Sequence, residues 1–248
     1  MFKRFMILAL AAGLLLAACQ PAGGAVVTTP APTQVTLPVR LDHSAGWLEP
    51  LVSACAAQQP QLAVILSENA VEEGGIELRW GQAGTDLPFV AQIGVERLAA
   101  VVSRNNTIRQ LPLEEFQRVL AGRILYWEEL DSTKCIECLR PDATIQPYAY
   151  PPEDPLAGQI EAALFPDTRL LPETILVPST SAMLEAVAAD ARALGFLPAR
   201  MIGDRTAELE LTDLPDPAVL DFPVLALSAS EPAGLARDWL LCVQDGLH

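Results

Sequence analysis

The spacing of apolar positions along the chain predicts strands that alternate with helices. Residues 35–41 have the pattern of a strand, and residues 46–58 have the periodicity of an amphipathic helix with Ser44 placed to cap it. Residues 62–66 form a continuous apolar run, which is typical of a buried strand. Three further strands are predicted at residues 76–80, 89–93 and 98–103.

The alternation continues in the second part of the chain. A helix is predicted at residues 112–120, because its apolar residues share one face, a proline opens it and a glycine follows it. Strands are then expected at residues 145–150, 174–177, 195–197 and 222–227, and helices at 156–165, 182–193 (capped by Ser179 or Thr180) and 232–243. This order favours an α/β fold, a mostly parallel sheet covered by helices and arranged in two lobes.

The N-terminal residues have the pattern of a bacterial lipoprotein signal peptide. Lys3 and Arg4 precede an apolar run at residues 5–16, and two alanines then lead to Cys19. A membrane-spanning helix is the alternative, but a span needs roughly 20 apolar residues. We therefore expect residues 1–18 to be removed and Cys19 to carry the lipid that holds the protein on the extracytoplasmic face of the cell membrane.

Residues 19–38 are predicted to form a flexible tether, because from Gln20 onward they are rich in Pro, Gly, Ala and Thr and carry no charge. The body that follows has the length of one large or two small domains. The formal charge of the 248-residue chain is −15, and loss of Lys3 and Arg4 with the signal makes it −17. A nucleic-acid partner is not expected, since phosphate backbones are held by clustered Lys and Arg.

Four cysteines remain once Cys19 is assigned to the lipid, and an even number in an exported protein suggests disulfides. Three connectivities are open. We favour Cys135 with Cys138, a local pair in a polar loop, and Cys55 with Cys242, each in a predicted helix. The Cys135–Cys138 spacing is also found in redox centres and zinc sites, but a zinc site needs two more ligands, and we expect no metal or cofactor.

Two stretches of the body resemble phosphate-type substrate-binding proteins of ABC transporters. In the first, a strand ends in two asparagines, a helix follows, and a glycine turn leads to a tryptophan: Leu98 to Leu130, with Asn105, Asn106, Pro112, Phe116, Gly122 and Trp127. In the second, a helix leads to a return strand with a glycine and an aromatic residue: Met183 to Ile202, with Gly195 and Phe196. Residues 42–60 are similar to the family's first loop and helix more loosely.

The resemblance implies the two-lobed type II periplasmic-binding-protein fold, each lobe a mostly parallel sheet flanked by helices. Lobe I would comprise residues 39–103 and 203–248, and lobe II residues 104–202, with hinges near Ser103 and residues 197–201. A bridge between Cys55 and Cys242 would then lie within lobe I. The implied function is delivery of a small solute, with phosphate or another oxyanion as the candidate, from the interlobe cleft to an ABC permease by a monomeric protein.

The residues expected to bind the solute are hydroxyls, a cation and a glycine that follow strands or open helices: Ser44, Arg79, Gly81, Ser179, Thr180 and Ser181. Helix capping explains Ser44 and residues 179–181 equally well. The family's arginine segment is replaced by residues 148–155, where Glu153 and Asp154 would repel an oxyanion. Those two acids also suit a solvated loop or a helix N-terminus.

Other residues in the body have structural interpretations. Trp80 and Trp127 are expected to be packed aromatics, and a lone His43 at a strand end is usually structural or exposed. No hydrolase, metalloprotease, P-loop or dinucleotide motif is present, so an enzyme is not expected. Two alternatives to transport are a degenerate binding-protein fold that acts as a cell-surface interaction or sensing module, and an extracytoplasmic enzyme.

Overall fold

The computed structural model describes residues 34–67, 74–83, 87–130, 144–165 and 174–248, all within one compact unit that spans residues 34–248. The predictions about Cys19, the tether up to residue 33, and the pair Cys135 and Cys138 lie outside the described residues. The end of the predicted tether, Val35 to Pro38, belongs instead to the strand Val35–Leu41. Across those described ranges, no helix combines the length and apolar character that a membrane span requires.

Five strands form what we call the first sheet half, in the order β2, β1, β3, β11, β4. β1 pairs in parallel with β2 and β3, while β11 runs antiparallel to β3 and to the first part of β4. Their bounds are β1 (Val35–Leu41), β2 (Leu62–Leu66), β3 (Ile76–Trp80), β4 (Phe89–Ser103) and β11 (Asp221–Ser228). The predicted strands at residues 35–41, 62–66 and 76–80 are confirmed with the same bounds.

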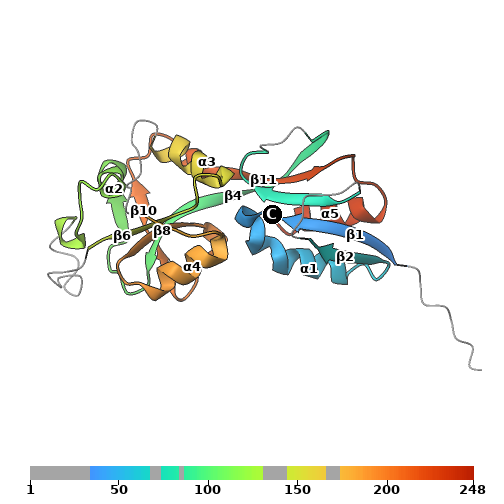
Figure 1. Cartoon of the computed structure of the whole chain (residues 1–248), viewed down its shortest axis with the longest axis horizontal. Helices are drawn as coiled ribbons and strands as arrows, with labels where there is room; N and C mark the ends of the chain where they lie inside the picture. The colour runs from blue at the N-terminus through green and yellow to red at the C-terminus, as the bar shows by residue number, and fades with distance from the viewer. Residues whose placement is uncertain (1–33, 68–73, 84–86, 131–143, 166–173) are drawn as a thin grey trace, which may run out of the picture. The chain divides into compact units, whose positions relative to one another are not determined.

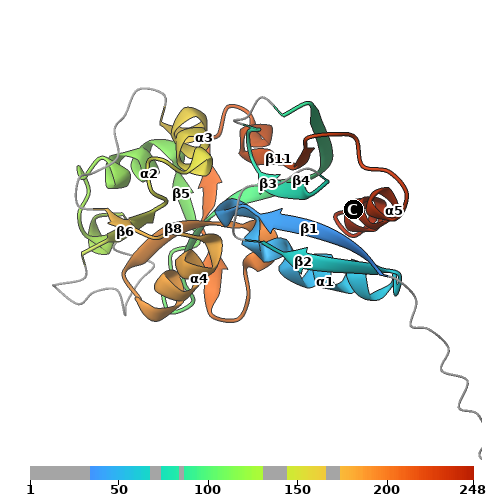
Figure 2. The same ribbon diagram turned by 45° about the vertical axis from the view of Figure 1, so that its right-hand side comes forward.

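The second sheet half continues from the last part of β4. Residues Leu98 to Val102 pair antiparallel with β8, which is followed in parallel order by β6 and β7. Figures 1 and 2 show β4 passing from the first sheet half toward β8 and β6. β9 pairs with β4, and β10 pairs with β5 in a separate two-stranded sheet. The bounds are β5 (Gln110–Pro112), β6 (Gln146–Ala149), β7 (Ile175–Leu176), β8 (Ala193–Pro198), β9 (Thr206–Glu208) and β10 (Glu210–Thr212). The lobe boundaries at residues 103/104 and 202/203 stay a prediction.

β4 is one strand of 15 residues, although the sequence predicts two strands at residues 89–93 and 98–103. The prediction of a break was wrong because Gly94 to Arg97 keep a partner: they pair with Asp221 to Val224 of β11. The register of the β4–β11 pairing shifts between Val224 and Leu225, so the pairing continues past an irregularity of the β-bulge type. A single strand therefore serves both sheet halves.

Five α-helices connect the described strands: α1 (Glu49–Ala57), α2 (Leu113–Leu120), α3 (Pro155–Leu164), α4 (Thr180–Ala189) and α5 (Leu235–Asp245). α1 packs against α5 and β2, whereas α4 packs against β8 and β4. α2 buries Phe116, Val119 and Leu120, as its predicted apolar face requires, and Gly122 past its end has a positive φ of 67°. Four short 3-10 helices complete the described chain: η1 (His43–Leu48), η2 (Trp127–Glu129), η3 (Ala199–Met201) and η4 (Pro217–Leu220).

The prediction that Ser44 caps the first helix was wrong. Asp42 is the N-cap of η1, and its carboxylate accepts a hydrogen bond from the Ser44 backbone N–H. Because the chain turns into η1 immediately after β1, Ser44 lies inside the first turn, and α1 begins only at Glu49. Ser179, by contrast, is the N-cap of α4, where its hydroxyl accepts from the Ala182 N–H.

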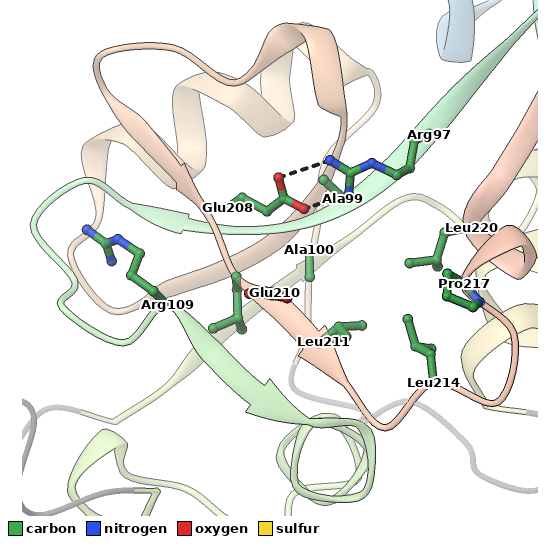
Figure 3. A pocket seen from close by; sticks show the side chains of 11 residues that line it. Arg97, Ala99, Ala100, Arg109, Glu208, Glu210, Leu211, Leu214, Pro217 and Leu220 are labelled. Carbon is green, nitrogen blue, oxygen red and sulfur yellow. Dashed lines mark hydrogen bonds and ion pairs between the residues drawn. The ribbon is translucent and has the colours of Figure 1, made fainter.

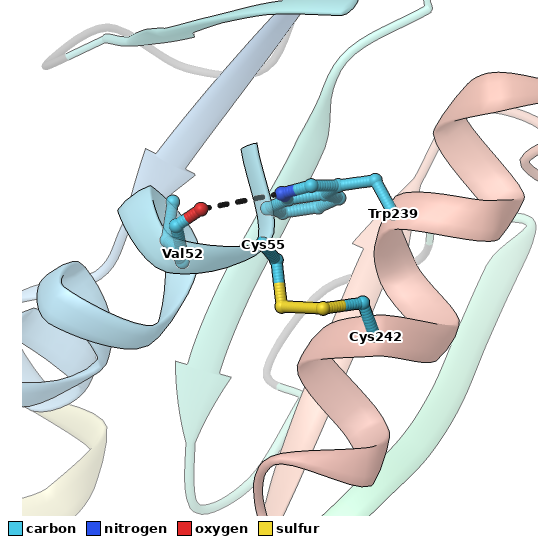
Figure 4. The surroundings of a disulfide bond; sticks show 4 residues. All are labelled: Val52, Cys55, Trp239 and Cys242. Atoms are coloured by element: carbon cyan, nitrogen blue, oxygen red, sulfur yellow. Dashed lines mark hydrogen bonds between the residues drawn. A yellow bond between two sulfur atoms is a disulfide. The ribbon is translucent and has the colours of Figure 1, made fainter. Parts of the chain in front are cut away.

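A disulfide joins Cys55 of α1 to Cys242 of α5, the pair favoured from the sequence. Figure 4 shows Trp239 beside it, whose indole N–H donates to the Val52 carbonyl at 3.4 Å. The two cysteines are 187 residues apart in the chain, so the bond closes a long loop and restricts the unfolded state strongly. It fastens the C-terminal helix to the first one.

An ion pair lies beside the residues where β4 and β8 begin to pair. Glu96 of β4 accepts hydrogen bonds from the backbone N–H and the guanidinium of Arg200 in η3, although Glu96 is only 6 % exposed. Arg200 also stacks over the Trp47 ring, 4.8 Å from its centroid. Trp80 packs edge-on against Trp47 and donates its indole N–H to the Glu96 carbonyl. These contacts join η1, β3, β4 and η3.

We expect Arg200→Gln to lower the free energy of unfolding by about 2–3 kcal/mol, because it leaves the buried Glu96 carboxylate without its cation. Arg205→Gln is the matched control, since Arg205 pairs with Glu185 on an exposed surface, and it should cost less than about 0.5 kcal/mol. Urea unfolding of the purified variants measures both. Equal costs would contradict a structural role for the Glu96–Arg200 pair.

Candidate functional site

Three segments meet around Arg79: η1 after β1, the turn after β3, and the helix α3. Ser44 of η1 is hydrogen-bonded to the Trp80 backbone N–H at 3.2 Å, and η1 packs against α4. Gly81 lies directly against Gln159 of α3. We call this region the Arg79 site. It brings together Ser44, Arg79 and Gly81 of the predicted ligand residues, and it places Gly81 next to α3.

Arg79 is buried and is held by acids of the chain itself. Its Nη2 donates to Glu77 Oε1 at 2.5 Å, and its Nη1 donates to the Ala83 carbonyl. Its Nε lies 3.7 Å from Asp42 Oδ2, which is an ion-pair distance but beyond a hydrogen bond, and among the described residues this N–H has no hydrogen-bond partner. Glu77 is bound in addition by Arg40 at 2.8 Å. The guanidinium is therefore fixed between two carboxylates.

Ser44 is also engaged within the chain. Its hydroxyl donates to Asp42 Oδ1 at 2.9 Å and accepts from the Trp80 N–H, and its own backbone N–H donates to the same Asp42 oxygen. Residues Asp42 and Ser44 are both buried. The hydroxyl expected to meet a solute thus connects β3 to the loop after β1.

Asp154 brings a third carboxylate to the Arg79 site. It is the N-cap of α3, and its Oδ1 accepts from the Leu156 N–H at 2.8 Å. Burial raises the pKa of Asp154 above its usual value, and the negative charge of Asp42 adds to this rise. The Leu156 N–H, His43 and Arg79 act in the opposite direction. Negative charge is therefore costly here.

Gly81 is required by the backbone and by its neighbour. Its φ is +109°, a region that residues with a side chain rarely adopt, and its N–H donates to the Pro223 carbonyl. A Cβ at this position would come within 2.1 Å of the Gln159 Nε2. The glycine lets α3 approach the turn after β3.

The three hydroxyls at the start of α4 have different surroundings. Ser179 caps the helix, Ser181 is exposed, and Thr180 is fully buried with a hydroxyl that has no hydrogen-bond partner in the described structure. No contact that we observe brings Ser179 or Ser181 to Arg79.

The remaining sequence expectations concern packing and exposure. Trp80 and Trp127 are buried, as predicted, and donate their indole N–H groups to the carbonyls of Glu96 and Arg192. His43 and Glu153 are exposed. Within the described ranges, no group of three or more His, Cys, Asp and Glu side chains has an arrangement that could hold a metal ion.

A cavity of about 480 Å³ lies elsewhere, between β4, β9, β10 and η4 (Figure 3). Arg97 and Glu208 form a two-point ion pair on one side, and Leu211, Leu214 and Leu220 provide an apolar side. The hydrogen bond to Glu208 raises the pKa of Arg97. None of the ligand residues predicted from the sequence lines this cavity.

Two of the acids beside Arg79, Asp42 and Glu77, are not among the site residues predicted from the sequence. Glu77 and Arg79 are two residues apart on β3 and so share one face of the strand. Asp42 stands two residues before Ser44, a spacing at which Asp often accepts from the backbone of a turn. Both signals are local and could have been found. The approach of Gln159 depends on the packing of α3 and has no such signal.

Comparisons with known proteins give structural matches without sequence matches. No protein-family model and no curated protein matches the chain. A phosphate-bound putative phosphate ABC transporter substrate-binding protein from Clostridium perfringens superposes with a TM-score of 0.66 at 12 % identity, over 84 % of this chain and 93 % of that one. An ABC-type phosphate transport receptor from Vibrio cholerae gives 0.54 at 15 % identity, over 86 % and 93 %.

Regulatory domains share the same fold. The reduced regulatory domain of OxyR2 from Vibrio vulnificus gives a TM-score of 0.54 at 14 % identity, covering 87 % of this chain and 97 % of that one. These similarities show that the chain has the type II periplasmic-binding-protein fold, as the sequence resemblance implied. At such identities they establish the fold and not the ligand.

We expect Gly81→Ala to lower the free energy of unfolding by about 3 kcal/mol, because it adds a contact with Gln159 to the cost of a positive φ. Gly74→Ala is the matched control: its φ is +88° with nothing near the added Cβ, so it should cost about 1 kcal/mol. Adding Gln159→Ala should recover part of the first loss. Equal losses in urea unfolding for the two alanine variants would show that Gln159 does not constrain the turn.

Proposed function

We propose that this protein is a lipid-anchored, extracytoplasmic solute-binding protein that delivers a small solute to an ABC permease. The observation that carries the proposal is the convergence of η1, the Gly81 turn and α3 at the Arg79 site, within a type II binding-protein fold. Two of the structures that share this fold are described as phosphate-transport binding proteins. None of the three structures named above is described as an enzyme.

The charge at the Arg79 site argues against a tightly held phosphate. Asp42, Glu77 and Asp154 bring three carboxylates, and the guanidinium of Arg79 is already paired with two of them. A dianion would be repelled, whereas an amine or a set of hydroxyls could interact with the carboxylate of Asp154. We therefore propose a small polar solute, with an amine-bearing solute fitting best.

A second candidate function is a cell-surface interaction or sensing module. The side chains at the Arg79 site bind one another: Ser44 to Asp42 and Trp80, and Arg79 to Glu77. The occurrence of the same fold in a regulatory domain supports this alternative. Binding of a solute separates the two.

Thermal unfolding of the purified full-length chain in mild detergent tests solute binding against phosphate, sulfate, amino acids, polyamines and sugars. A solute at 100 times its dissociation constant should add about 2.7 kcal/mol of stability. We expect an amine-bearing solute to give this shift, and Asp154→Asn to weaken its binding about tenfold, or ~1.4 kcal/mol.

Asp216→Asn serves as the control for that variant, because Asp216 caps η4 on an exposed surface in the same way as Asp154 caps α3. It should leave the shift unchanged. If no solute in the panel raises the unfolding temperature, transport is the wrong function and the interaction module takes its place.

The lipid anchor has a separate test. Mass spectrometry of the chain made in a bacterial host should show an N-terminal peptide that begins at residue 19 and carries a lipid on its cysteine. Cys19→Ser should abolish the modification, and Cys138→Ser should leave it intact. An unmodified N-terminus on the wild-type chain would refute the lipoprotein assignment.

A further inference from the structure

We propose that Asp42 acts as a built-in anion: its carboxylate occupies the position between Ser44 and Arg79 that an oxyanion would otherwise take, and so excludes oxyanions from the Arg79 site. Asp42 would then be the residue that determines specificity against phosphate and sulfate. The inference deepens the proposed solute-binding function and rests on it for the meaning of the site.

The donors around Asp42 are of the kinds that bind oxyanions. Its Oδ1 receives the backbone N–H of Ser44 at 3.1 Å and the hydroxyl of Ser44 at 2.9 Å. Its Oδ2 faces the guanidinium of Arg79 at 3.7 Å. A main-chain N–H, a hydroxyl and an arginine form a typical donor set for phosphate or sulfate. Here the Asp42 carboxylate accepts from the first two donors and faces the third at ion-pair distance.

Arg79 supplies independent evidence that this position suits a larger anion. Its side chain is 9 % exposed, and its Nε–H faces Asp42 but has no acceptor within hydrogen-bonding distance in the part of the chain that the structure describes. A buried N–H without an acceptor is rare in folded proteins. The carboxylate of Asp42 stops short of this donor, whereas a tetrahedral oxyanion has two more oxygens that could reach it.

The structure also explains why an oxyanion cannot simply join Asp42. Both would need the Ser44 donors, and Asp42 is 7 % exposed, so two negative charges would meet with little solvent between them. Asp154 lies close enough to interact electrostatically with Asp42 and adds to the repulsion. Removal of the Asp42 charge is therefore the change that should admit an anion.

The test uses Asp42→Ser in the full-length chain in mild detergent. Serine keeps a cap acceptor for the Ser44 N–H but removes the charge and leaves space. We compare sulfate at a saturating concentration, on the order of 10 mM, with chloride at the same ionic strength. Sulfate should raise the unfolding temperature of this variant by about 3 °C or more relative to chloride. The wild-type chain should show no such difference, and Arg79→Gln in the variant background should remove the gain.

Asp216→Ser is the matched control, since Asp216 has the same capping role in η4 on an exposed surface, and it should show no gain with sulfate. If Asp42→Ser fails to fold, Asp42→Asn removes the charge while keeping the shape, and a smaller gain is expected. No gain in the folded variant overturns the proposal, and so does a sulfate or phosphate shift in the wild-type chain. A sulfate or phosphate shift in the wild-type chain would overturn the role of Asp42 but leave solute transport standing. If no solute in the panel shifts the unfolding temperature of the wild-type chain, the transport proposal fails, and the Asp42→Ser result still tests the role of Asp42.

Discussion

The structure depends on one strand that hydrogen-bonds to both sheet halves. β4 pairs with β11 up to Arg97 and with β8 from Leu98 onward, so its backbone is continuous across the junction. The Glu96–Arg200 pair lies at that junction, where the carboxylate accepts both the backbone N–H and the side chain of Arg200. Because the buried carboxylate needs its cation, the pair fixes η3 against β4 at the point where the pairing changes. A hinge motion of the kind found in this fold would have to bend the chain close to these contacts.

The same arrangement positions the Arg79 site. The carboxyl ends of β1 and β3 lie side by side because those strands are parallel neighbours, and this places Asp42 next to Arg79. Trp80 then connects the two regions, since its backbone N–H donates to Ser44 and its indole donates to the Glu96 carbonyl. Trp80 is therefore in contact both with the junction and with the Arg79 site. The disulfide between α1 and α5 lies near the C-terminal end of α1, away from η1. It connects these two helices without involving the residues of the junction or of the Arg79 site.

Sequence periodicity predicted most of the regular elements. The elements that it did not predict depend on contacts between distant residues or are too short to show a period. The buried face of α2 and the bounds of β1 to β3 followed from local pattern alone. The unbroken course of β4 did not, because Gly94 to Arg97 are held by pairing with β11, a partner more than 120 residues away. β9 and β10 are three residues each, too short for any period to appear. The partners Asp42 and Glu77 of the candidate residues lie at local spacings in the sequence, but the approach of Gln159 comes from the packing of α3, which local pattern does not contain.

The Arg79 site shows why a shared fold does not fix a ligand. A buried arginine must have its charge compensated, and the compensation can come from a bound solute or from the chain. Here Glu77 and Asp42 provide it, so the folded state is complete without an oxyanion. A donor that remains at the site is the Arg79 Nε–H, which is buried and has no acceptor among the described residues. Because the chain itself supplies the carboxylates that compensate this arginine, the same fold can be present without the same ligand.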